Sequence, residues 1–252
     1  MIDILFQDHS IFVLNKPAGL VVAPTNTQSE PTLVDLLRTE YRIDLERAGL
    51  VHRLDKDTSG VMVVAKTQNA LENLQNQFKS RQVKKEYLAL VHGQTQSDGE
   101  IDGAIGRNPQ NREKFIVTPD GKPATTRYQT TKHLEMEDET INRLYPEFNK
   151  IQRRKMDVSG YKYFSLLRCF PLTGRTHQIR VHLKYIDHPI VGDERYAGRK
   201  ISRLDHRWCA RQFLHAAKLE FNHPETGERM SFESELPEDL ILVLLNLNET
   251  TK

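Results

Sequence analysis

One short segment holds most of the side chains that could carry acid, base or electrostatic chemistry. Residues 52–60 read His-Arg-Leu-Asp-Lys-Asp-Thr-Ser-Gly and combine two carboxylates, two hydroxyls, a histidine and a glycine. The apolar run at residues 61–65 follows directly, which predicts a polar loop anchored by a buried strand. We therefore expect an active or binding site in this loop.

The same residues match the opening of a calcium-binding loop. Asp55, Asp57, Ser59 and Gly60 stand at its first, third, fifth and sixth positions. The twelfth position needs a bidentate glutamate but is Lys66, and the flanking residues have the pattern of strands rather than of paired helices. The sequence therefore does not favour a calcium site.

Other metal and cofactor sites are not indicated either. His177 and His182 lack the spacing and the glutamate of a zinc-binding helix, and no glycine-rich phosphate or dinucleotide loop is present. The only cysteines, Cys169 and Cys209, stand among apolar or aromatic residues, so neither a disulfide framework nor a cysteine zinc cluster is expected. We expect no metal and no cofactor.

The elements that must position the loop are short strands and helices in mixed order. Strands are expected at residues 4–6, 11–14, 61–65, 85–91, 161–170, 213–221 and 230–235, with hairpins between 95 and 132. Helices are expected at 32–41, 69–78, 176–185 and 237–246, the second with a capping box from Asn69 to Glu72. Residues 134–160 lack periodicity and are expected to form a loop or insertion that contacts the substrate. No linker interrupts the chain, which predicts one sheet-centred domain over residues 1–252.

Composition and charge indicate a globular protein with local basic surfaces. Hydrophobic residues make up 38% of the 252 residues and charged residues 28%, which suits a packed core. No signal peptide or run of about 20 apolar residues is present, and with two cysteines this predicts a cytoplasmic protein. Net charge is only +2, but basic residues gather at 79–85, 150–155 and 195–211. These stretches indicate a polyanionic partner if they share a face.

Several motifs in a fixed order give the chain a family resemblance. They are Asn15-Lys16-Pro17-Ala18-Gly19, the segment 52–60, Lys85-Glu86-Tyr87, the segment 174–183, His188-Pro189-Ile190 with Gly192-Asp193, and Leu214-His215-Ala216. Together they resemble the catalytic domain of the RluA family of bacterial ribosomal large-subunit pseudouridine synthases. The resemblance covers nearly the whole chain. It implies an α+β fold with a central mixed, largely antiparallel sheet, flanked by helices and loops and crossed by an RNA-binding cleft.

The resemblance also implies roles for individual residues. Asp55 corresponds to the essential carboxylate, Tyr87 to the aromatic residue that packs on the target base, and Arg180 to the salt-bridge partner of the carboxylate. Arg53 corresponds to the arginine that enters the space left by the flipped nucleotide. RNA contacts are expected from His52, Thr58, Lys85 and Arg175.

Isomerisation of uridine to pseudouridine agrees with this set of side chains. The bond from ribose C1′ to N1 of uracil breaks, and C1′ is joined to C5 instead. A carboxylate can assist either by attacking C1′ or by removing the 2′ proton to give a glycal. An adjacent arginine keeps the carboxylate ionised, and Tyr87 is a candidate acceptor for the C5 proton. The sequence leaves both routes open.

The partner expected from the resemblance is structured RNA, either 23S ribosomal RNA or tRNA. The catalytic pattern starts almost at Met1, so we expect no preceding RNA-binding module, no obligatory protein partner and a monomer. An alternative is a non-catalytic RNA-binding or RNA-chaperone protein that retains the fold. Another is a hydrolase that uses Asp55 and Asp57 as paired acids. Without the resemblance, Arg53 reads as an ion-pair partner of Asp57 and Tyr87 as a core aromatic residue.

Overall fold

The structure is a computed structural model that describes residues 2–24 and 30–250. Two compact units can be distinguished in the chain. The first unit comprises Met1–Glu86 and His215–Glu235, and the second comprises Tyr87–Leu214 and Leu236–Lys252. The expectation of a single domain over residues 1–252 stays a prediction.

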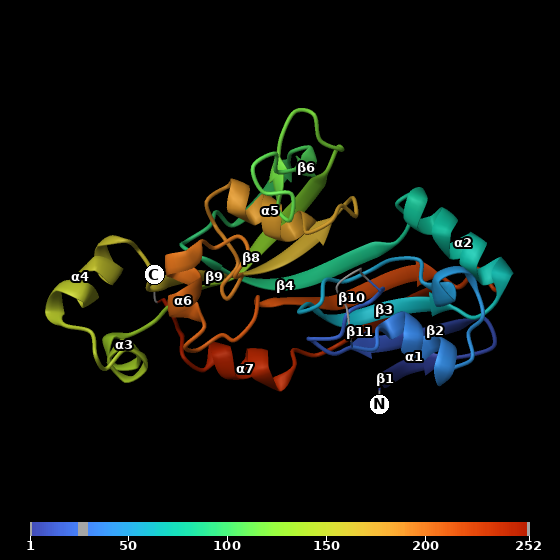
Figure 1. Cartoon of the computed structure of the whole chain (residues 1–252), viewed down its shortest axis with the longest axis horizontal. Coiled ribbons are helices and arrows are strands. Elements are labelled where there is room, and N and C mark those ends of the chain that lie inside the picture. The colour runs from blue at the N-terminus through green and yellow to red at the C-terminus, as the bar shows by residue number, and fades with distance from the viewer. Residues whose placement is uncertain (1, 25–29, 251–252) are drawn as a thin grey trace. The chain divides into compact units, whose positions relative to one another are not determined.

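The first unit contains a mixed sheet of five strands in the order β1-β2-β3-β10-β11 (Figure 1). β2 pairs antiparallel with β1 and with β3, and β10 pairs parallel to β3 and antiparallel to β11. The strands are β1 (Asp3–Gln7), β2 (Ile11–Lys16), β3 (Ser59–Ala65), β10 (Leu214–Asn222) and β11 (Arg229–Glu233).

Burial on both faces explains why β3 is a continuous apolar run. Every residue of β3 is buried. On one face Val61 and Val63 pack against Leu71 and Leu74 of helix α2 (Gln68–Lys79). A strand covered on both faces has no polar positions to alternate with apolar ones. The buried strand expected after the polar loop is therefore confirmed.

Two further helical segments lie in the described part of the first unit. Helix α1 (Leu33–Thr39) begins after Thr32, whose side chain forms a capping box with Asp35, and a 3₁₀ helix η1 spans Glu46–Gly49. The capping box expected from Asn69 is wrong, because helix α2 begins at Gln68 and its N-cap is Thr67, two residues before Asn69. The hydroxyl of Thr67 accepts the N–H of Ala70 instead.

The second unit is built on antiparallel strands. β4 (Lys84–His92) pairs with β9 (Tyr163–Pro171), which pairs with β8 (Thr125–Glu135). β8 also pairs with β5 (Asp98–Asp102) and β12 (Asn248–Glu249). A separate hairpin joins β6 (Ile105–Arg107) to β7 (Phe115–Val117), so the expectation of hairpins in this stretch is confirmed.

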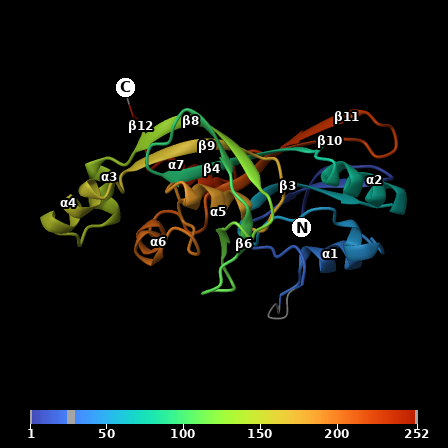
Figure 2. The same ribbon diagram turned by 90° about the horizontal axis from the view of Figure 1, so that it is seen from above.

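Among the described residues of the second unit there are five helices, and two of them replace an expected loop. They are α3 (Asp138–Leu144), α4 (Lys150–Val158), α5 (Gln178–Tyr185), α6 (Arg199–Asp205) and α7 (Glu238–Leu244). In Figures 1 and 2, α3 and α4 lie together beyond the end of β8. Residues 134–160 are thus largely helical, and the side chain of Asn149 caps α4. Few apolar side chains of this segment, such as Ile141 and Met156, are buried in the core. Substrate contact by this segment stays a prediction.

The mixture of helices with largely antiparallel strands confirms the expected α+β class. One parallel pair, β3 with β10, makes the sheet of the first unit mixed. Over the described residues, no helix is long and apolar enough to cross a membrane.

Candidate active site

The loop that carries Asp55 lies between Leu50 and the start of β3 in the first unit. Leu50 forms an isolated bridge with Val64, and the Thr58 N–H donates to the Asp55 carbonyl oxygen at 3.1 Å. The side chain of Leu54 is only 4% exposed, whereas Asp55 is half-buried. A buried leucine thus anchors a tight turn whose acid can still reach a substrate.

The buried side chain of Lys16 holds this loop in place. Its side chain is fully buried at the end of β2. The ammonium donates to the carbonyl oxygens of Lys56, Pro17 and Leu20, at 2.9, 2.7 and 2.9 Å. A buried ammonium is tolerated only when its donors are satisfied. Lys16 therefore holds the backbone next to Asp55 in one position, a role that the sequence did not indicate.

Where the loop enters β3, close backbone packing requires a glycine. Gly60 has a φ of +117°, and a Cβ at this position would lie 2.2 Å from the carbonyl oxygen of Ala216 in β10. One residue earlier, the Ser59 hydroxyl and His215 Nδ1 are 2.9 Å apart, and His215 Nε2 reaches the Ser234 carbonyl oxygen at 3.0 Å. His215 therefore has a structural role, and Thr58, which precedes Ser59 in the sequence, is buried.

His52 and Lys85 influence each other within the first unit. The His52 ring stacks on Phe78 with ring centres 4.8 Å apart, and its Nε2 accepts the N–H of Val63 at 3.1 Å. Burial and the nearby Lys85 ammonium lower the pKa of His52 to about 3, so this histidine is neutral at physiological pH. Burial also lowers the pKa of Lys85 to about 8. These contacts show that His52 orders the loop, while its contact with RNA stays a prediction.

Arg53 differs from its neighbours because it is exposed. It lies between His52, whose ring faces the protein, and the buried Leu54. An exposed guanidinium on an anchored loop is suited to enter a nucleic acid. That role stays a prediction.

In the second unit, Arg180 is held by a buried ion pair. Its Nε donates to Asp193 Oδ2 at 2.7 Å and its Nη2 to Asp193 Oδ1 at 2.8 Å. The guanidinium also lies over the ring of Tyr196, 5.0 Å from the ring centre. Arg180 is 6% exposed and Asp193 is fully buried. This two-point contact fixes the plane of the guanidinium.

The segment around Asp193 is fastened by a second buried carboxylate. Asp205 Oδ2 accepts the backbone N–H of Gly192 at 2.9 Å and lies 3.0 Å from His92 Nε2. Its Oδ1 accepts the hydroxyl of Tyr161 at 2.8 Å. Burial, with the charge of Asp205 added to it, raises the pKa of Tyr161, which therefore stays a hydrogen-bond donor. The network extends from β4 to helix α6 and supports the residues that hold Arg180.

Tyr87 and Arg175, the other residues expected in this unit, lie on different elements. Tyr87 is half-buried on β4, opposite Cys169 of β9. Arg175 is exposed before α5, and its Nε donates to the carbonyl oxygen of Pro123 at 3.1 Å. Asp55 belongs to the first unit, whereas Tyr87 and Arg180 belong to the second. The predicted pairing of Arg180 with Asp55 therefore stays a prediction.

His177 and His182, which lack the spacing of zinc ligands, form hydrogen bonds within the protein. His182 is buried between Thr126 Oγ1 and the carbonyl oxygen of Gly103, each 2.9 Å away. His177 Nδ1 lies 2.8 Å from the hydroxyl of Tyr196. Within the described part of the chain, no group of three or more histidine, cysteine or acidic side chains is arranged to hold a metal ion.

Lys16 and Asp193 hold other parts of the site in position, and the sequence motifs did not assign this role to either of them. Each stands in one of the recognised motifs, but motif order alone does not say which side chains point inward. For Lys16 no local signal exists, because Asn15 separates it from the apolar run at residues 11–14. For Asp193 we find no such signal either.

Comparisons with known proteins agree with this arrangement. A family model described as RNA pseudouridylate synthase matches residues 10–185. An uncharacterized RNA pseudouridine synthase of Bacillus subtilis is 39% identical over 98% of this chain and 73% of its own length. Ribosomal large subunit pseudouridine synthase D of Nitrosomonas europaea is 40% identical over 96% of this chain and 64% of its own length.

Solved structures give the same result for the fold. The structure of human RNA pseudouridylate synthase domain containing 1 superposes with a TM-score of 0.73 at 27% identity, covering 100% of this chain and 89% of that chain. Human RNA pseudouridylate synthase domain containing 4 gives a TM-score of 0.69 at 25% identity, covering 98% and 94%. The matched range 10–185 includes Asp55, Tyr87 and Arg180.

Proposed function

Because this chain belongs to the RNA pseudouridylate synthase family and is thus an isomerase of uridine in RNA, we propose that Asp55 is its catalytic carboxylate and that its substrate is large-subunit ribosomal RNA. The observation that carries the proposal is the family match over residues 10–185, which contains Asp55 on an anchored, accessible loop. The alternative of a non-catalytic RNA-binding protein is not favoured, since the named relatives are synthases.

The chemistry proposed for Asp55 needs a carboxylate that is both fixed and ionised. The buried Lys16 and the turn to Thr58 support the first requirement. For the second we propose Arg180, whose guanidinium is already oriented by Asp193. Asp55 then attacks C1′ of the target nucleotide or removes its 2′ proton, and in either route the bond from C1′ to N1 breaks. The freed uracil turns so that C5 bonds to C1′, which releases Asp55 from C1′ or returns the proton to C2′, and C5 then loses its own proton.

The remaining roles concern access to the base. A uridine stacked in a helix must be extruded before its glycosidic bond can react. We propose that the exposed Arg53 fills the space that the base leaves and that Tyr87 packs on the extruded uracil. We further propose that Arg175 and Lys85 bind RNA phosphates, and that His52 and Thr58 keep the loop in place at the RNA surface.

The proposed substrate comes from the names of the relatives. Several of them, including the Nitrosomonas europaea protein, are named ribosomal large subunit pseudouridine synthase D. We also propose a cytoplasmic location, which a ribosomal RNA substrate supports. Deletion of the gene, followed by chemical mapping of pseudouridines in total cellular RNA, tests the proposal. We expect loss at one or a few sites of 23S ribosomal RNA, and an unchanged map would contradict it.

Lys85 gives the proposed RNA contact a pH dependence. Its pKa of about 8 means that the free protein carries this charge below pH 8 and loses it above. A phosphate binds the charged form, so we expect the Kd for RNA to rise above pH 8 by up to about tenfold per pH unit. Binding at constant ionic strength between pH 7 and 9 measures this. In Lys85→Arg the side chain stays charged. An equal pH slope in that variant would rule out Lys85 as the source.

A further inference from the structure

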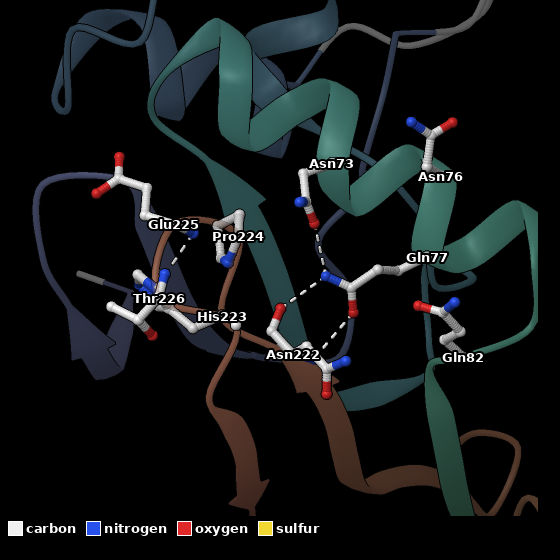
Figure 3. A pocket seen from close by; sticks show the side chains of 10 residues that line it. Asn73, Asn76, Gln77, Gln82, Asn222, His223, Pro224, Glu225 and Thr226 are labelled. Carbon is white, nitrogen blue, oxygen red and sulfur yellow. Dashed lines mark hydrogen bonds between the residues drawn. The ribbon is translucent and has the colours of Figure 1, made fainter.

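A pocket of about 420 Å³ opens on the first unit, away from the loop of Asp55. Figure 3 shows it between helix α2 and the turn that joins β10 to β11. Half of its lining residues are carboxamides, and only Glu225 has a full charge. The lining residues are Asn73, Asn76, Gln77, Gln82, Asn222, His223, Pro224, Glu225, Thr226 and Gly227.

Gln77 forms the floor of this pocket, and hydrogen bonds within the protein hold its side chain in place. Its Nε2 donates to Asn73 Oδ1 and to the carbonyl oxygen of Asn222, both at 2.7 Å. Its Oε1 accepts the N–H of Asn222 at 2.8 Å. Gln77 is 6% exposed, so these bonds join helix α2 to strand β10 inside the protein. The floor therefore does not need a ligand to become ordered.

The opposite wall is fixed by His223. Its Nδ1 accepts the N–H of Thr226 at 3.1 Å, so its Nε2 carries the proton and donates to Asp8 Oδ2 at 2.8 Å. This clamp holds Pro224 on the side of the pocket that faces α2, whereas the Glu225 carboxylate points away from α2 (Figure 3). The pocket is thus rigid on two sides.

Two carboxamides of the lining are available to a ligand. Within the described residues, the side-chain amides of Asn76 and Gln82 make no hydrogen bond, and both side chains are exposed. Each amide has a donor and an acceptor in one plane. The edge of a nucleobase has the same combination.

One basic side chain contacts the lining of the pocket, and others stand next to it in the sequence. Arg229 donates to the carbonyl oxygen of Gln82 at 3.2 Å and to Asn222 Oδ1 at 3.4 Å, and it also pairs with Glu220 at 3.1 Å. Lys79, Arg81 and Lys84 are exposed and stand on either side of Gln82 in the sequence. The lining itself therefore has few full charges, with basic side chains next to Gln82.

We propose that this pocket binds one unpaired nucleotide of the RNA substrate. The carboxamides hydrogen-bond the base, and the basic residues next to Gln82 contact its phosphates. The proposal rests on the proposed function only in taking RNA as the ligand.

The separation from Asp55 gives the pocket a role in choosing the substrate. His215 pairs with Ser59 at the start of β3, and Asn222 lies seven residues further along β10. At about 3.3 Å per residue this is about 23 Å. The pocket is therefore too far away to hold the target uridine itself. It selects RNAs in which an unpaired nucleotide lies several positions from the uridine.

Side-chain amide NMR signals test this binding without any turnover. We expect at least one of AMP, CMP, GMP and UMP to shift the NH₂ resonances of Asn76 and Gln82. The variant Asn76→Ala/Gln82→Ala should lose nucleotide binding, whereas Gln75→Ala, on the same helix but outside the pocket lining, should retain it. Absence of shifts with all four nucleotides would overturn the proposal, as would shifts with N-acetylglycinamide alone, which would indicate a peptide ligand.

Kinetics on a large-subunit ribosomal RNA transcript provide the second test. The double variant is expected to raise KM about tenfold at unchanged kcat, because two hydrogen bonds outside the reaction centre are lost. An unchanged KM would contradict the proposal. Asp55→Ala should keep the nucleotide-induced shifts while losing turnover, so failure of the catalytic assignment and failure of the pocket can be told apart.

Discussion

The Asp55→Ala protein is expected to bind RNA with a Kd close to that of the wild type while its rate of pseudouridine formation falls by at least about 10³-fold. The carboxylate acts at the sugar, and no other side chain of the loop can replace it at the same position. Affinity depends mainly on basic residues and phosphates and should not fall when an acid is removed. Single-turnover assays with a saturating amount of enzyme, together with filter binding, measure the two quantities separately.

Asp57→Asn is the matched control, since it removes the other acid of the same loop. If Asp55 alone reacts with the nucleotide, this variant should keep its rate within about tenfold of the wild type. Equal losses in both variants would support paired acids and contradict the assignment. Full activity of Asp55→Ala would do so as well.

Asp193→Ala is expected to lower the free energy of unfolding by about 3–5 kcal/mol, because it leaves the guanidinium of Arg180 buried without its carboxylate. Turnover should fall by at least about 10²-fold, since the arginine loses its orientation. Urea unfolding, followed by the fluorescence of Trp208, measures this stability. Trp208 is the single tryptophan and belongs, like Asp193, to the second structural unit.

An exposed ion pair of the same unit provides the comparison. Arg127 and Glu100 are 2.6 Å apart, with side chains 61% and 47% exposed. Glu100→Ala should therefore change the stability by no more than about 1 kcal/mol. Equal effects of the two substitutions would show that the buried pair contributes no more than a surface pair does.

The order of the motifs was enough to predict the fold class and the place of the polar loop. Residues 61–65 are apolar without alternation, and the structure buries both faces of β3. Helices α3 and α4 could not be predicted in the same way. They bury little more than Ile141, Tyr145 and Met156, so an apolar stripe of helical period is missing.

The inward side chains of the site could not be predicted from local patterns. Lys16 reaches a carbonyl group 40 positions further along the chain, and Asp205 contacts His92 across 113 positions. Charged side chains are buried only when partners, here distant in the sequence, form ion pairs or hydrogen bonds with them. A single sequence does not show which residues those partners are. The cap of α2 shows the same limit on a smaller scale, because Thr67 and Asn69 are both acceptable caps.

The parallel pairing of β3 with β10 has a consequence for the synthesis of the protein. The partner of Ser59 is His215, 156 positions later, so the strand that follows the Asp55 loop lacks one neighbour until most of the chain has left the ribosome. Contacts between such distant segments form late and slowly. A nascent chain therefore cannot present the finished Asp55 loop until His215 and its neighbours in β10 have been synthesised.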